Sequence, residues 1–107
     1  MTLKELNALL KKTGFPVAYS HFLRPTKPPF LCYLEETSSA LTADGKIVLS
    51  VSSMRVELYT SKRDREAEKR VEDLLGGAGL IFEKQCEYID AEKLFLASYD
   101  FELEESE

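Results

Sequence analysis

The sequence predicts an α+β domain, with two helices packed on a mainly antiparallel, twisted sheet in the element order α-β-β-β-α-β-β. Three observations lead to this prediction. Apolar residues recur at helical spacing at 3–13 and 62–75, and strand-like apolar segments lie between and after these helices. The dipeptide at 44–45 is Asp-Gly, a strong turn signal between strands. Alternating groups, a helix, then strands, then a helix, then strands, favour the α+β class.

The first helix is expected over residues 3–13. Thr2 and Glu5 fit a capping box, in which the Thr2 hydroxyl accepts from a first-turn amide and the Glu5 carboxylate reaches back. Gly14 can adopt the left-handed conformation that ends a helix. Four leucines form one core-facing stripe at helical spacing: Leu3, Leu6, Leu9 and Leu10.

The segment after this helix is extended at 15–22 and then carries three prolines, Pro25, Pro28 and Pro29. Proline fixes φ and lacks an amide donor, so residues 23–29 cannot lie inside a sheet. We interpret them as a stiff, extended surface loop. A proline-rich ligand for another domain is the alternative, but a single short cluster is weak support for it.

Residues 30–34 are continuously apolar, which predicts a central strand covered on both faces. The polar, small residues at 35–40 are interpreted as a loop or a frayed edge. Asp44-Gly45 then joins a short strand at 41–43 to a long strand that begins at Lys46.

The long strand, 46–60, changes its apolar face part of the way along. Ile47, Leu49 and Val51 share one parity, whereas Met54, Val56 and Leu58 share the other. A strand changes parity only through an extra residue. We therefore predict a bulge or bend at Ser52-Ser53 that joins two strand halves.

A second helix is expected over residues 62–75, because Ser61 and Asp64 resemble a capping box and an apolar stripe follows: Ala67, Val71, Leu74 and Leu75. Its other faces carry many charges of both signs, among them Arg63 and Arg65. A solvated surface is the simpler interpretation, and a polar interface with a partner subunit is the alternative. Glycines at 76, 77 and 79 end the helix.

The last predicted unit is a hairpin, with strands at 81–89 and 93–103 joined by a turn at 90–92. The acidic segment 104–107 is expected to fray. The domain is therefore expected to span residues 1–103, with a C-terminal tail at 104–107.

Composition restricts the class of protein. The chain has 107 residues, 44% hydrophobic and 31% charged, which fits one globular domain, and its formal net charge of -5 argues against a dominant phosphate-binding surface. Cys32 and Cys86 lie in apolar, strand-like segments; we favour buried free thiols, with a disulfide as the alternative. With neither a signal-peptide pattern nor 18 consecutive apolar residues, we expect a cytosolic origin.

The sequence shows no recognisable catalytic constellation, and we expect neither an enzyme nor a metal or cofactor site. Ser20 and His21 are adjacent in an extended segment, where neighbouring side chains point to opposite faces. The carboxylates cluster on the second helix and the tail, and none has an obviously apolar setting. The glycines at 76–79 end a helix and lack the spacing of a phosphate-binding loop.

Several segments between residues 14 and 101 together resemble a known family: Pro16–Phe22, Lys27–Phe30, Tyr33–Leu34, Val56–Asp64, Ile81–Lys84, Tyr88–Ile89 and Glu92–Phe95. The family is that of the tail terminator, or tail-completion, proteins of the head–tail module in long-tailed phages and prophages of Gram-positive bacteria. Its pattern usually has glycine where this chain has Ser20.

The resemblance implies a structural subunit that forms a ring, commonly of six copies, at the head-proximal end of the tail tube. The implied partners are further copies of the chain, the major tail-tube protein and a head-completion or connector protein. The implied location is the host cytoplasm during assembly and then the tail or neck of the virion. DNA would pass through the ring without sequence-specific binding, and an acidic lumen would favour its transit.

The candidate contacts with neighbouring subunits or the tail tube lie in the predicted turn, the proline loop and the start of the second helix: Asp44, Gly45, Lys46, Pro25, Lys27, Pro28, Arg63 and Arg65. There are two alternative functions, and only the first shares all of these physical features. One is a small interaction or adaptor domain with no place in a virion. The other, disfavoured by the lack of a basic face, is an enzyme or nucleic-acid-binding module on a ferredoxin-like sheet.

Overall fold

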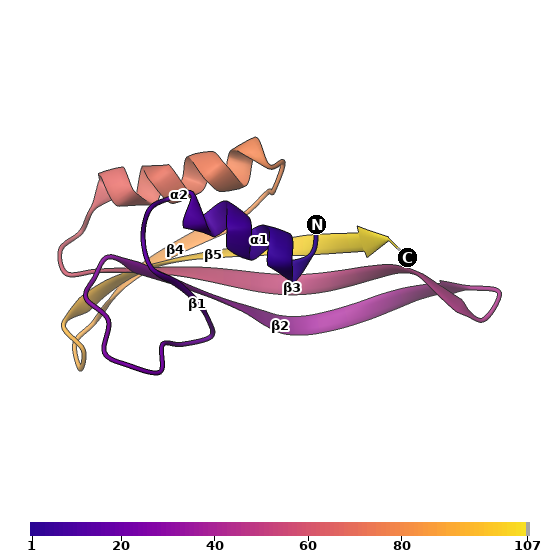
Figure 1. Ribbon diagram of the computed structural model, residues 1–107, viewed down its shortest axis with the longest axis horizontal. Coiled ribbons are helices and arrows are strands. Elements are labelled where there is room, and N and C mark those ends of the chain that lie inside the picture. The colour runs from indigo at the N-terminus through magenta and orange to yellow at the C-terminus, as the bar shows by residue number, and fades with distance from the viewer. Residues whose placement is uncertain (107) are drawn as a thin grey trace.

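Both helices lie on one face of a five-stranded sheet, and the opposite face carries no helix (Figure 1). The computed structural model describes residues 1–106. The elements, in chain order, are α1 (Leu3–Lys11), β1 (Val17–Tyr19), β2 (Phe30–Ala43), β3 (Lys46–Thr60), α2 (Arg65–Gly77), β4 (Glu83–Ile89) and β5 (Leu94–Ser106). The predicted α+β class and element order are confirmed.

The strand order in the sheet is β1-β2-β3-β5-β4. β1 pairs with β2 in parallel, and the other three pairs are antiparallel. Because residues that pair across strands share a face, the register places Met54, Val56 and Leu58 of β3 on the helix-covered face together with their partners in β2 and β5. The core lies between this face and the two helices.

The core is made by leucines of α1, the apolar stripe of α2 and the inward residues of the central strands. Its members are Leu6, Leu10, Leu31, Tyr33, Met54, Val56, Leu58, Ala67, Val71, Leu75, Ala97, Tyr99, Phe101 and Leu103. Arg70 links α2 to the α1–β1 connection through two contacts. Its guanidinium group donates to the Thr13 carbonyl at 3.1 Å, and its Cζ atom lies 5.2 Å from the centroid of the Phe15 ring.

The helix starts depend on side-chain caps. The capping box at Thr2 and Glu5 is confirmed, with the two reciprocal bonds at 3.1 and 3.0 Å. Gly14 has φ 85°, as the expected helix end requires, although α1 itself stops at Lys11. α2 begins later than expected because Asp64, not Ser61, is the N-cap and accepts from the Ala67 amide at 3.0 Å.

The expectation of a loop at 35–40 is wrong, because β2 runs without interruption from Phe30 to Ala43 and includes the short strand expected at 41–43. Along this stretch β3 supplies backbone partners on one side and water is available on the other. Small polar residues can therefore continue the strand without any apolar alternation.

The predicted bulge at Ser52-Ser53 is also wrong, since β3 pairs with β5 in one unbroken register from Leu49 to Thr60. The extra residues lie elsewhere, at Glu36 of β2 and at Val48 of β3. Along β3 the apolar residues change from odd to even positions because they move from one face of the sheet to the other, without an extra residue between them. Leu49 and Val51 lie on the face without helices, and Ser50 and Ser52 replace them on the other.

Two expectations about the chain termini and cysteines are corrected. Residues 104–106 belong to β5 and pair with residues 49–51 of β3, so they are not a frayed tail; Glu107 lies outside the described residues. Cys32 is buried and Cys86 is exposed, and both thiols are free. The registers place them on opposite faces of the sheet, opposite Glu57 and Ala97 respectively, which separates the two sulfurs.

Candidate interaction surfaces

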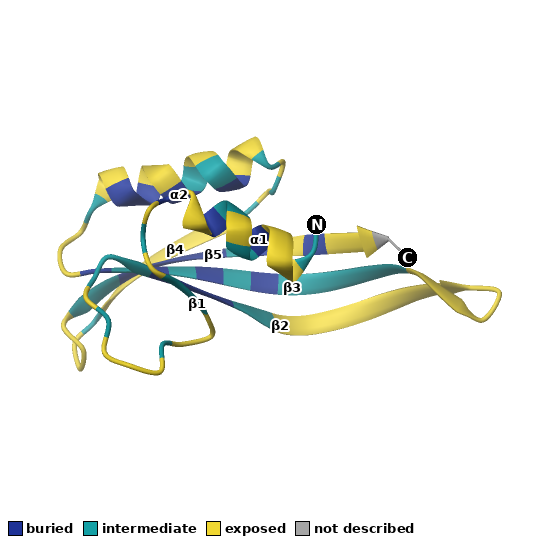
Figure 2. Cartoon of the chain, viewed as in Figure 1, coloured by how far each residue is buried: buried dark blue, intermediate teal, exposed yellow. Residues whose placement is uncertain are grey.

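The β2–β3 hairpin extends beyond the helices as a two-stranded arm (Figure 1). Its turn at Asp44-Gly45 confirms the sequence prediction, and both residues have positive φ, 53° and 75°, as a type I′ turn requires. Every residue from 36 to 48 is exposed (Figure 2). This arm helps to give the molecule a longest dimension of 51 Å, against 27 and 21 Å in the other two directions.

The arm carries apolar side chains that no part of the described chain covers. Leu41 is 58% exposed, Ile47 48% and Val48 47%. A two-stranded ribbon is at best marginally stable by itself, and it gains most when another surface covers it. The arm is therefore a candidate contact surface, and Lys46 lies at its tip beside the turn.

The outer edge of β2 is open along the same arm. β1 pairs only with residues 31–33, and the Tyr19 hydroxyl accepts from the Glu35 amide at 3.1 Å just beyond that pairing. From residue 36 to Ala43, no strand in the described chain lies on this side of β2. Free backbone donors and acceptors along such an edge can pair with another extended segment.

The loop between β1 and β2 lies beneath the sheet at the end opposite the arm (Figure 1). Phe22 packs edge-on against Phe30, with 5.3 Å between the ring centroids, and Phe30 stacks on Tyr59, with 5.0 Å between the ring centroids. This aromatic column anchors the loop to the sheet. Leu23 next to this anchor is 93% exposed. Arg24 is exposed as well.

The three predicted contact residues of this loop differ in exposure: Pro25 and Lys27 are exposed and Pro28 is half-buried. Pro29, at the end of the loop, lines a small pocket of about 320 Å³ together with residues 60–64 before α2. The loop and the start of α2 are therefore neighbours. The hairpin tip lies far from both, so the eight predicted contact residues belong to two separate regions (Figure 1).

Ser20 and His21 do not lie as the sequence suggested. Ser20 has φ 66°, which takes the chain out of the extended conformation, and its hydroxyl oxygen lies 3.2 Å from His21 Nδ1. Both residues are exposed on the loop. The pair has no third group to orient the imidazole among the hydrogen bonds of residues 1–106.

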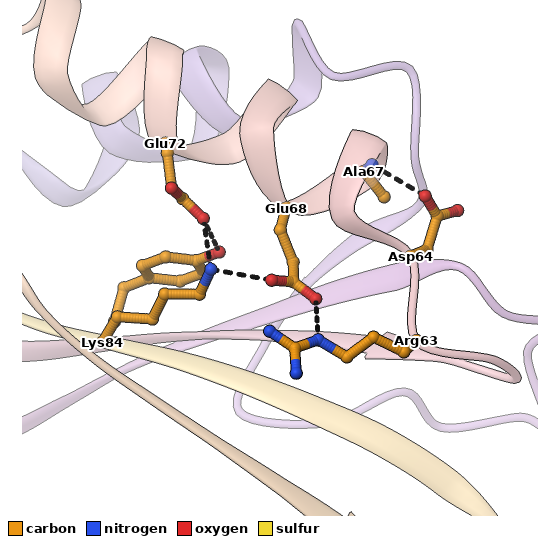
Figure 3. A network of polar contacts seen from close by, with 7 residues as sticks. Arg63, Asp64, Ala67, Glu68, Glu72 and Lys84 are labelled. Carbon is orange, nitrogen blue, oxygen red and sulfur yellow. Dashed lines mark hydrogen bonds and ion pairs between the residues drawn. The ribbon is translucent and has the colours of Figure 1, made fainter.

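Arg63, one of the predicted contacts, is partly used within the chain. Its Nε donates to Glu68 at 3.2 Å, and Lys84 Nζ of β4 donates to the same carboxylate at 2.7 Å (Figure 3). Burial by itself would raise the pKa of Glu68, but the bonds from Lys84 and Arg63 outweigh it and lower that pKa. Arg65, in contrast, is exposed and has no ion pair within the described residues.

Glu68 is the acid that the sequence analysis missed. It is only 5% exposed, although no acid was expected in an apolar setting. A signal was present, because Glu68, Val71 and Leu75 follow the i, i+3, i+7 spacing of a core stripe. Its partners Arg63 and Lys84 could not be identified from the sequence, since they approach it from outside the helix.

The network continues from Lys84 into the core. Lys84 also donates to Glu72 at 2.7 Å (Figure 3). The buried Tyr99 hydroxyl donates to the same carboxylate at 2.9 Å. Burial and the Glu72 carboxylate together raise the pKa of Tyr99, which keeps the phenol protonated. Every buried side-chain nitrogen and oxygen of residues 1–105 has a hydrogen-bond partner. The network therefore fastens α2 to β4 and β5.

The face without helices has its own ion pair, from Arg55 of β3 to Asp100 of β5. Arg55 Nε lies 2.9 Å and Nη2 3.4 Å from the two carboxylate oxygens, a bidentate arrangement. Nearby, the Tyr59 hydroxyl donates to Glu57 at 3.1 Å, and burial raises the pKa of Glu57. The Arg55–Asp100 pair links β3 to β5, whereas the Tyr59–Glu57 bond lies within β3.

An open groove of about 950 Å³ runs along the edge of β5. β4 begins at Glu83, opposite Asp100, so from Phe101 onward no described strand covers this edge. The N-terminal ammonium group donates to the Glu104 carbonyl at 3.0 Å within the groove. The lining includes apolar residues of the α2–β4 connection and five acids: Glu36, Glu83, Asp100, Glu102 and Glu104.

Within residues 1–106, no three His, Cys, Asp or Glu side chains are grouped closely enough to bind a metal ion. No helix in the same range is long and apolar enough to cross a membrane. Comparison of the chain with protein-family models and with curated proteins gives no match.

Proposed function

We propose that this chain is a structural, non-enzymatic subunit of the head–tail junction of a long-tailed phage or prophage. In this role it resembles a tail terminator: copies assemble into a ring, commonly of six, that ends tail-tube polymerisation and allows the head to attach. The observation that supports this proposal best is the hairpin arm, with residues 36–48 all exposed and an open strand edge.

The arm suits assembly because its features serve no purpose within the chain. Leu41, Ile47 and Val48 contribute nothing to the core, and the outer edge of β2 leaves backbone groups for a partner. A surface that covers these side chains would have to come from another molecule. A contact between two different surfaces of identical subunits is heterologous, and such contacts close into rings when the rotation allows.

The body behind the arm is built to hold it in a fixed place. β3 continues from the arm into the centre of the sheet, where it pairs with β5 along twelve positions. Its Met54, Val56 and Leu58 side chains belong to the core that residues of both helices complete. The Glu68 and Glu72 network fixes α2 to the same sheet. Such a scaffold supports a role in which surfaces must stay in register around a ring, with the major tail-tube protein and a head-connector protein as the other partners.

The experiment that tests the proposal replaces apolar residues of the arm and examines the particles. Leu41→Asp and Val48→Asp are expected to fold normally, because both side chains are about half exposed or more. Particles from a strain that carries either variant should have abnormally long tails or tails that do not join heads. Electron microscopy of the tails and the titre of infectious particles measure both effects.

Leu3→Asp is the matched control. Leu3 is an exposed apolar residue, 36% accessible, outside the arm, and an acid in the first turn of a helix suits the helix dipole. This variant should give normal tails. Normal tails and full infectivity from the arm variants, or from particles that lack the gene altogether, would refute the proposed role and favour an interaction domain outside the virion.

A further inference from the structure

Two surfaces at different places on the molecule are opposite in charge, and each presents an exposed apolar side chain. The first is the groove along the free edge of β5. Its rim is acidic, with Glu83, Glu102 and Glu104 all exposed. Its two positive groups already have partners within the chain: Arg55 is bound to Asp100, and the N-terminal ammonium group donates to the Glu104 carbonyl. The apolar part of its wall includes Ile81, whose side chain is 92% exposed. An occupant of this groove should be extended and should combine an apolar side chain with positive charge.

The second surface is the loop at 20–28. It is extended by its prolines, carries Arg24 and Lys27 without any acid, and presents Leu23 at 93% exposure. The neighbouring Phe22 is held against Phe30, so the aromatic anchor fixes the base of the loop and leaves Leu23 pointing away from the body. The loop has the combination of features that the groove lacks.

We propose that the loop 20–28 of one copy docks in the β5 groove of the next copy, with Leu23 against Ile81 and Arg24 and Lys27 facing Glu102 and Glu104. The contact rests on the ring assembly proposed above and names the surfaces that neighbouring subunits use. An extended segment beside the β5 edge would also find backbone groups to pair with between Asp100 and Glu104, whose own carbonyl already accepts from the N-terminal ammonium group.

A second copy is the occupant that the charges favour. The loop lies beneath the sheet at the end opposite the arm, whereas the groove follows the C-terminal end of β5, so the loop of one molecule lies away from its own groove (Figure 1). The hairpin arm is a poorer occupant of the acidic groove, because residues 36–48 carry two acids, Glu36 and Asp44, and one base, Lys46, and so a net charge of -1. A loop-to-groove contact is heterologous and leaves one loop and one groove free for further copies, as ring growth requires.

The test uses cysteine cross-linking inside assembled tails. The variant L23C/I81C is made in a Cys86→Ser background, because Cys86 is exposed and would cross-link by itself. Tails are purified from particles that carry this variant and are mildly oxidised. Docking predicts a ladder of disulfide-linked oligomers on a non-reducing gel, since every copy links to the next.

The matched control is L23C/K69C in the same background, in which the second thiol sits on the outer face of α2, where the Lys69 side chain is 74% exposed. It should give monomers only. Monomers from L23C/I81C in tails that do contain the protein would overturn the docking and leave the ring subunit intact. Absence of the protein from purified tails would instead refute the proposed function, so the two failures are distinguishable.

A charge swap supplies a second, independent readout. R24E/K27E in the L23C/I81C background should lower the yield of linked oligomers by about tenfold, and so should E102K/E104K, because each places like charges across the contact. Combining the two pairs should restore the yield. Unchanged yields in the separate swaps would overturn the charge pairing, and a combination that fails to restore the ladder although both parents fold normally would do the same.

Discussion

At the scale of single residues, Ser20 holds the least favourable backbone conformation in the chain outside a turn. β1 ends at Tyr19, and Ser20, with φ 66°, redirects the chain into the loop that carries Leu23. Only glycine adopts this region at no steric cost, and a side chain there costs about 1–2 kcal/mol. The conformation is maintained because the Ser20 amide donates to the Tyr33 carbonyl at 2.8 Å.

The first prediction is that Ser20→Gly stabilises the protein. We expect the free energy of unfolding to rise by about 0.5–1 kcal/mol, because relief of the backbone strain exceeds the added entropy of glycine in the unfolded chain. Urea denaturation measures the change. Ser20→Ala serves as the control, since it keeps Cβ and removes only the hydroxyl near His21. If both variants shift the midpoint equally, the strain is not the cause.

The buried carboxylate of Glu68 is the second residue with a specific consequence. Its folded-state pKa lies below the ordinary value of 4.5, which applies to the unfolded chain. At a pH between these two pKa values, the unfolded chain therefore binds more protons than the folded chain. Stability from Glu68 is therefore fully present above pH 4.5 and is lost as the pH falls through the folded-state pKa. Glu68→Gln removes this dependence while it keeps the shape of the side chain.

We predict that Glu68→Gln lowers the free energy of unfolding by about 1–3 kcal/mol at neutral pH, because Lys84 and Arg63 lose their charged partner. The difference from the unsubstituted protein should shrink as the pH falls below 4.5. Denaturant titrations at several pH values measure both effects. Asp73→Asn, which breaks the exposed Lys69–Asp73 pair, should cost less than about 0.5 kcal/mol at any pH. A constant difference across the pH range would contradict the role of Glu68.

At the scale of elements, the hairpin arm is separable from the core. Its exposed residues, 36–48, bury little surface, so the arm adds little to the stability of the body. We predict that replacing residues 40–50 by an Asn-Gly turn, which joins Ser39 directly to Val51, changes the free energy of unfolding by less than about 1 kcal/mol. Thermal and urea denaturation test this.

The same truncation should abolish ring assembly, if the arm has the proposed function. A point substitution in the body provides the contrast. Tyr99→Phe removes only the hydroxyl that donates to Glu72, so it should lower stability but leave the arm unchanged. A large loss of stability on truncating the arm would show that it belongs to the folding core, contrary to its exposure.

Elements with local signals were predictable from the sequence. The capping box at Thr2 and the Asp44-Gly45 turn depend on residues close in the chain, and both are found where expected. The apolar stripes of the helices are found in part, because Leu6, Leu10, Ala67, Val71 and Leu75 lie in the core whereas Leu3 is exposed. The full length of β2 was not predictable, because a ribbon exposed on both faces needs no apolar period. The bulges at Glu36 and Val48 and the partners of Glu68 arise from pairing between distant segments, for which the sequence carries no local signal.

At the scale of the whole molecule, some charged residues form ion pairs within the fold and others lie exposed on its surface. Arg55, Arg63 and Lys84 neutralise acids inside the fold. The remaining charges near the two proposed docking surfaces are of opposite sign, with Arg24 and Lys27 on the loop and Glu102 and Glu104 on the groove. The arm, with Leu41, Ile47 and Val48, is apolar instead. The molecule thus offers one electrostatic contact and one hydrophobic contact, and these respond differently to salt.

The last prediction follows from that difference. Raising the ionic strength from about 0.1 M to about 1 M shortens the Debye length from about 10 Å to about 3 Å, which screens the loop–groove charges but not apolar burial. We expect the initial rate of disulfide formation in purified L23C/I81C, in the Cys86→Ser background, to fall several-fold over this range. A second reporter, R24Q/K27Q in the same L23C/I81C protein, lacks the loop charges and should form the disulfide at a rate that salt hardly changes. Equal salt dependence of the two reporters would show that charge does not guide the loop into the groove.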